Sequence, residues 1–112
     1  MGLFKQNEML NSIKQLLGLG PKIDYRDLVY NGAQIIDVRT PGEFKGGHIK
    51  GAVNIPLQNI SSQMNRIGRD KPVITCCASG MRSASAKSIL ISNGYSEVYN
   101  GGGWLSLESK LR

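Results

Sequence analysis

Two adjacent cysteines, Cys76 and Cys77, carry the strongest chemical signal in this chain. They follow an apolar run at residues 73–75 and precede a segment of small residues that leads to Arg82. A loop of this kind, between a strand and a helix, can direct several backbone N–H groups at one point. A thiolate held there is stabilised and reactive at neutral pH. The segment therefore predicts cysteine chemistry on an anionic or sulfur-bearing substrate.

The spacing within the loop allows either cysteine to be the nucleophile. Counted from Cys76, the motif is Cys-x5-Arg-Ser, which can wrap a phosphate while Arg82 binds its oxygens. Phosphoryl transfer to the thiolate would follow, as in cysteine phosphatases. Counted from Cys77, the loop is one residue shorter, and its smaller ring of N–H groups suits a persulfide or a sulfur oxyanion better. The loop alone leaves both interpretations open.

Short apolar runs alternate with helical patterns along the chain, and these elements must position the loop. Strands are expected over residues 34–38, 52–55, 73–76 and 97–99. Helices are expected after N-caps at Asp24 and Thr40, across residues 57–67, after the cysteine loop, and around Trp104. This alternation predicts an α/β fold of three layers, with a central, mostly parallel sheet of about five strands and helices on both faces. Ligands of such folds bind at the carboxyl ends of the strands, where the loop lies.

The N-terminal segment differs from the rest of the chain. Leu10, Ile13 and Leu17 share one helical stripe, and a Gly- and Pro-containing stretch ends it at residues 18–21. We expect an amphipathic helical extension at residues 1–20 and one domain at residues 21–112. Packing of the extension against the domain is the favoured interpretation, with dimerisation or contact with a membrane surface as the alternatives.

Several segments outside the loop resemble the rhodanese-like domain family. The resemblance covers about residues 22–109 and rests on residues 37–44, 47–56 and 94–100 and on the glycine-rich turn before Trp104. The family's active loop is typically Cys-Arg-Ser-Gly-Asn-Arg-Ser, and its nucleophile position falls on Cys77. The resemblance thus implies Cys77 as the catalytic residue. It also implies a substrate- and anion-binding loop of Ala78, Ser79, Gly80, Met81, Arg82 and Ser83.

The function that the resemblance implies is that of a sulfurtransferase of the thiosulfate sulfurtransferase type. Cys77 would take sulfane sulfur from a donor such as thiosulfate or a persulfide and pass it to a thiophilic acceptor, without a metal or an organic cofactor. Ala78 stands where the family often has arginine, and Met81 replaces a polar residue. The loop is therefore less cationic than usual, which leaves room for a protein persulfide or a less charged donor.

Two alternatives of other kinds stay open at this stage. One is a cysteine phosphatase or arsenate reductase that uses Cys76, and the other is a non-catalytic rhodanese-like binding module.

Three polar residues are expected to support the loop rather than to react. Asp37 and Arg39 form a polar pair at a strand end. His48, the single histidine, is structural in the resembling family, and one histidine beside two adjacent cysteines argues against a metal site.

The composition argues against several other classes of protein. No apolar run approaches the roughly 20 residues that cross a bilayer, and the N-terminus lacks the continuous apolar core of a signal peptide. The basic residues behind the net charge of +6 are scattered, unlike a nucleic-acid-binding surface. We expect a cytoplasmic protein whose partners are a small sulfur donor and a thiol acceptor, with a protein persulfide as a further possible donor. The sequence predicts no oligomeric state.

Overall fold

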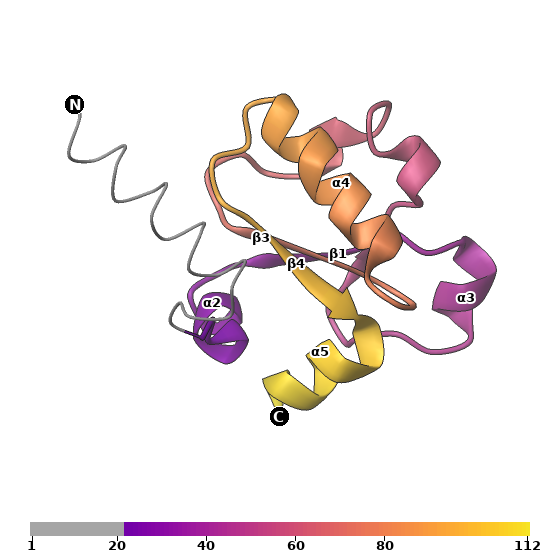
Figure 1. Ribbon diagram of the computed structural model, residues 1–112, viewed down its shortest axis with the longest axis vertical. Helices are drawn as coiled ribbons and strands as arrows, with labels where there is room; N and C mark the ends of the chain where they lie inside the picture. Colours follow the sequence, from indigo (N-terminus) through magenta and orange to yellow (C-terminus); the bar gives the residue numbers. More distant parts are fainter. Residues whose placement is uncertain (1–21) are drawn as a thin grey trace.

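The computed structural model describes residues 22–112, which fold around one parallel sheet (Figure 1). The strands are β1 (Gln34–Asp37), β2 (Val53–Asn54), β3 (Val73–Cys77) and β4 (Val98–Gly103). They pair in the order β2-β1-β3-β4, and each neighbouring pair is parallel. The sheet of the described residues has four strands, close to the expected five, and the predicted α/β class is confirmed. All carboxyl ends therefore meet at one edge of the sheet.

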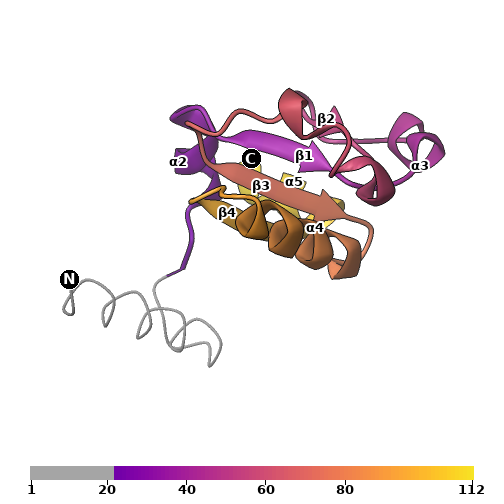
Figure 2. The same cartoon turned by 90° about the horizontal axis from the view of Figure 1, so that it is seen from above.

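Helices cover both faces of this sheet, as the sequence predicts. They are α2 (Tyr25–Tyr30), α3 (Pro41–Lys45), α4 (Met81–Ser92), α5 (Trp104–Leu111) and two short 3-10 helices, η1 (Leu57–Asn59) and η2 (Met64–Arg66). Helix α4 lies on one face, and α2 and α5 lie on the other (Figures 1 and 2). The segment over residues 57–67, expected to be helical, is thus split into two 3-10 turns.

Each face of the sheet has its own apolar core, and the alternation of β3 divides its side chains between them. Cys77 packs in the core under α4, together with Val73 and Leu90. Cys76 packs in the opposite core, together with Ile74 and Leu107 of α5. Successive residues of a strand point to opposite faces, so the two adjacent cysteines cannot serve the same site.

Helix α3 begins directly after β1 because its first turn carries a complete capping box. The Thr40 side chain accepts a hydrogen bond from the N–H of Glu43, and the Glu43 carboxylate accepts one from the N–H of Thr40. Pro41 occupies a first-turn position, where its missing N–H costs nothing. The cap expected at Asp24 is also present at the start of α2. The capping box fixes the Glu43 side chain at the carboxyl edge of the sheet.

The glycines at residues 101–103 extend β4, whereas the sequence suggested a turn there. A Cβ atom on Gly101 would lie 2.9 Å from both Ile74 Cγ2 and Leu107 Cδ2. A Cβ atom on Gly103 would lie 2.9 Å from the carbonyl oxygen of Ala78. Glycine is needed because the backbone of β4 passes very close to β3 and to the loop that follows it.

The expected extension over residues 1–20 lies outside the described residues, so that division of the chain stays a prediction. Within the described part of the chain, none of the helices combines the length and the apolar character that spanning a membrane demands.

Candidate active site

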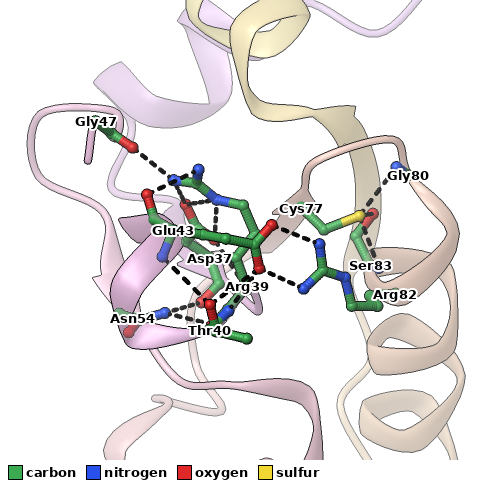
Figure 3. A network of polar contacts seen from close by, with 10 residues as sticks. All are labelled: Asp37, Arg39, Thr40, Glu43, Gly47, Asn54, Cys77, Gly80, Arg82 and Ser83. Atoms are coloured by element: carbon green, nitrogen blue, oxygen red, sulfur yellow. Dashed lines mark hydrogen bonds and ion pairs between the residues drawn. The ribbon is translucent and has the colours of Figure 1, made fainter. Parts of the chain in front are cut away.

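The sulfur of Cys77 lies at the carboxyl end of β3, inside the turn that leads into α4 (Figure 3). It accepts a hydrogen bond from the N–H of Gly80 at 2.9 Å and another from the N–H of Ser83 at 3.4 Å. Gly80 has φ 104°, a left-handed conformation that glycine adopts without strain and that turns its N–H toward the sulfur. Cys77 itself is buried, while Ala78 and Ser79 of the loop are exposed. The predicted loop therefore forms a cradle of N–H groups around one sulfur atom.

The two cysteines differ sharply in acidity. Burial opposes ionisation of Cys77, but hydrogen bonds from the Ser83 hydroxyl and from the N–H groups of Ser83, Gly80 and Ser79 outweigh it and lower the pKa of Cys77. For Cys76, burial and the nearby Asp37 charge raise the pKa to about 12. Cys77 is thus the more acidic thiol of the pair, and Cys76 is a buried thiol in the opposite core.

A network around Asn100 holds the loop against β4, and no local pattern in the sequence predicts it. The Ser83 hydroxyl lies 3.4 Å from the Cys77 sulfur and 2.6 Å from Asn100 Oδ1. Its single proton bonds Asn100 while Cys77 is a thiol and can turn to the sulfur when Cys77 is a thiolate. Asn100 Oδ1 also accepts from the N–H of Gly102 at 2.9 Å, and the Asn100 amide donates to the carbonyl oxygen of Gly80 at 3.2 Å. Asn100 therefore positions both the Ser83 hydroxyl and the turn of the cradle.

We expect Ser83→Ala to raise the pKa of Cys77 by about one unit, since a hydrogen bond to a charged group contributes about that much. The measurement is the pH dependence of Cys77 alkylation by iodoacetamide in a Cys76→Ala background. Ser85→Ala is the matched control, because Ser85 is an exposed serine of the same helix that bonds only within α4. An alkylation profile unchanged by Ser83→Ala would mean that backbone N–H groups alone hold the thiolate.

The Arg82 guanidinium points toward Glu43 of α3 (Figure 3). Its Nη1 and Nη2 lie 2.7 Å and 3.0 Å from Oε1 and Oε2 of Glu43, so the ion pair is bidentate. Its partner is 39 positions earlier in the chain, and the expected role of Arg82 in substrate binding stays a prediction. Glu43 was missed as a site residue, although its place in the capping box was visible in the sequence.

Asp37 and Arg39 form a buried ion pair at the carboxyl end of β1, as the sequence suggested. The guanidinium binds the carboxylate at 2.7 Å through Nη2 and at 2.9 Å through Nε, and the N–H of Arg39 donates to the same carboxylate. Arg39 also donates to the carbonyl oxygen of Gly47 at 2.7 Å and stacks 4.7 Å from the Trp104 ring centroid. The pair thus ties β1 to the segment after α3 and to the start of α5.

His48 and Met81 take no part in the cradle contacts. The His48 ring is exposed, stacks on Phe44 at a centroid distance of 3.7 Å, and bonds through Nδ1 to the Phe44 carbonyl oxygen. Met81 is 79% exposed at the first position of α4, so the loop carries an apolar side chain on its outer surface. No group of three or more side chains suited to a metal ion lies within residues 22–112.

Several curated relatives align with this chain over about two thirds of its length. It is 51% identical over 71 residues to the uncharacterized protein YqhL of Bacillus subtilis, an alignment that takes in 63% of this chain and 56% of that protein. It is 36% identical over 75 residues to thiosulfate sulfurtransferase GlpE of Pseudomonas aeruginosa, covering 67% of this chain and 68% of that protein. It is 38% identical over 77 residues to thiosulfate sulfurtransferase PspE of Escherichia coli, covering 67% of this chain and 74% of that protein.

Solved structures agree on the fold. A reduced Bacillus anthracis protein described as CoADR-RHD matches with a TM-score of 0.66 and 38% identity, over 76% of this chain and 15% of that one. An Escherichia coli rhodanese with anions matches with a TM-score of 0.59 and 34% identity, over 67% of this chain and 91% of that one. The family model described as "Rhodanese-like domain" matches residues 23–109, which span the sheet, the cradle and most of α5. The chain belongs to the rhodanese-like domain family.

Proposed function

We propose that this protein is a sulfurtransferase that carries sulfane sulfur as a persulfide on Cys77. The observation that carries the proposal is the cradle, in which the Cys77 sulfur accepts hydrogen bonds from Gly80 and Ser83 and its pKa is lowered. Lowering the pKa of a cysteine favours its reactive thiolate form and reduces the need for a separate general base. The names of the relatives GlpE and PspE support the same reaction class.

The proposed reaction has two displacement steps. The Cys77 thiolate attacks the outer sulfur of a donor such as thiosulfate, a new S–S bond forms, and the donor's S–S bond breaks with its electron pair leaving on sulfite. An acceptor thiolate then attacks the outer sulfur of the persulfide, and the Cys77 thiolate leaves. The N–H groups of Gly80 and Ser83 face the negative charge on the Cys77 sulfur at the start and at the end of this cycle.

Detection of the covalent persulfide intermediate by mass spectrometry tests the proposal. We expect purified protein treated with thiosulfate to gain the mass of one sulfur atom on the peptide that contains Cys77. Cyanide should remove that sulfur as thiocyanate. Protein that gains no sulfur from thiosulfate, from a thiosulfonate or from an alkyl persulfide would contradict the proposal.

The two alternatives fit the residues less well. A phosphatase or arsenate reductase using Cys76 would need a thiolate at that position, whereas Cys76 lies in the core opposite the loop and its pKa is raised to about 12. A binding module would not need the lowered pKa of Cys77. A reactive thiol at Cys77 is best preserved in a reducing compartment, in line with our expectation of a cytoplasmic protein.

A further inference from the structure

The loop that holds Cys77 has a single charged side chain, and that charge is already neutralised. Arg82 is the only basic residue between Cys77 and Ser83. Its two terminal nitrogens engage both carboxylate oxygens of Glu43, at 2.7 Å and 3.0 Å. A bidentate pair of this kind fixes the guanidinium plane as well as its position. An anionic donor that arrives at the cradle therefore meets Arg82 together with a fixed negative charge.

Glu43 is held in place and stays ionised. Its Oε1 also accepts hydrogen bonds from the N–H of Thr40 at 3.0 Å and from the Thr40 hydroxyl at 3.1 Å. Hydrogen bonds from Arg82, then from Thr40, lower the pKa of Glu43 to about 2. The Glu43 carboxylate is thus charged at neutral pH. The bonds to Thr40 hold the Glu43 carboxylate where Arg82 reaches it.

We propose that Glu43 sets the charge preference of this site for its sulfur donor. By pairing with Arg82, it disfavours a dianion such as thiosulfate and suits the site to donors with less negative charge, of the alkyl persulfide class. The inference deepens the proposed function and rests on it for the identity of the donors. With such a donor, the Cys77 thiolate attacks the outer sulfur of R–S–SH. The new S–S bond forms as the old one breaks, the proton stays on the transferred sulfur, and R–S⁻ leaves.

Coulomb repulsion makes the proposal quantitative. The repulsion energy between Glu43 and a donor is proportional to the donor's charge. The change that Glu43 causes in the logarithm of kcat/KM is therefore twice as large for a dianionic donor as for a monoanionic one. Thiosulfate and methanethiosulfonate form a suitable pair of probes, because both present a terminal sulfur bonded to a tetrahedral sulfur, with charges of −2 and −1. Added salt should shrink the difference between them.

The variant Glu43→Gln tests this directly. Glutamine still completes a capping box with Thr40, so α3 keeps its start, while the negative charge next to Arg82 is removed. We expect kcat/KM to rise about tenfold for thiosulfate and about threefold for methanethiosulfonate, because one negative charge beside Arg82 is removed. Glu97→Gln is the matched control, since Glu97 is an exposed carboxylate that directly precedes β4, at the opposite edge of the sheet. The proposal would be overturned if the ratio of kcat/KM for thiosulfate to kcat/KM for methanethiosulfonate were the same in wild type and in Glu43→Gln.

A second readout does not depend on sulfur transfer. Iodoacetate and iodoacetamide alkylate the same thiolate but carry charges of −1 and 0, so the ratio of their rates cancels the pKa of Cys77. We expect this ratio to rise about threefold in Glu43→Gln and to stay constant in Glu97→Gln. A constant ratio in Glu43→Gln overturns the charge preference even if Cys77 carries sulfur. A raised ratio in a protein that takes sulfur from no donor upholds it and rejects only the sulfurtransferase.

Discussion

Cys77→Ser should lower kcat/KM for any sulfur donor by at least about a thousandfold, as the loss of a covalent nucleophile does in other enzymes. The serine hydroxyl would sit in the same cradle of N–H groups, but it does not ionise near neutral pH and forms no persulfide. No other side chain of the loop can replace it, since the remaining residues are Ala78, Ser79, Gly80, Met81, Arg82 and Ser83. The measurement is thiocyanate formation from thiosulfate and cyanide, together with the sulfur load found by mass spectrometry.

The adjacent cysteine provides the matched control. Cys76 lies in the core on the α5 side, and burial raises its pKa to about 12, so its thiol is not available to a donor. We expect Cys76→Ala to keep kcat/KM within about twofold, at the cost of a small cavity in the core. The opposite pattern, with activity lost in Cys76→Ala and kept in Cys77→Ser, would move the nucleophile to Cys76 and restore the Cys-x5-Arg-Ser interpretation.

The sequence alone left the choice between these cysteines open for a physical reason. Alternation along a strand shows that Cys76 and Cys77 face opposite sides, but it does not show which side the loop bends toward. That depends on the packing of α4 over the face that holds Cys77 and of α5 over the face that holds Cys76. The flanking segments favour Cys77, because a family resemblance carries tertiary information that the loop does not.

The elements were predictable where their signals are local. The N-cap at Asp24 and the capping box of Thr40 and Glu43 need only neighbouring residues, and both are present. The contacts that shape the site are not local. Glu43 reaches Arg82 across 39 residues, and Ser83 reaches Asn100 across 17. Such pairs depend on the alignment of the elements at the carboxyl edge of the sheet, which no periodicity or capping signal encodes.

The glycines at residues 101–103 show the limit of propensity arguments. Glycine is depleted in strands, so three in succession predict a turn. In the fold they extend β4, because Gly101 approaches Ile74 and Leu107 too closely for any side chain. Tertiary contact overrides the local preference here, and the same close approach brings Asn100 to the cradle.

The largest effect on stability should come from Asp37→Asn, which we expect to lower the free energy of unfolding by about 3–5 kcal/mol. The asparagine keeps the shape of the side chain but leaves the Arg39 guanidinium buried without a counter-charge. Three donors of Arg39 are involved, its backbone N–H and its Nε and Nη2 groups, which lie 3.0 Å, 2.9 Å and 2.7 Å from Asp37 carboxylate oxygens. Urea unfolding followed by fluorescence of Trp104 measures the change.

An exposed ion pair provides the comparison that isolates burial as the cause. Glu108 and Arg112 lie 3.6 Å apart, and Arg112 is 78% exposed, so Glu108→Gln should cost less than about 1 kcal/mol. A similar small loss in Asp37→Asn would mean that water reaches Arg39 once its partner is gone. The double variant Asp37→Asn, Arg39→Met removes the unpaired charge, and it should recover part of the stability lost in the single variant. Recovery would assign the loss to the isolated guanidinium, whereas a further decrease would assign it to the bonds that Arg39 makes to Gly47 and the contact with Trp104.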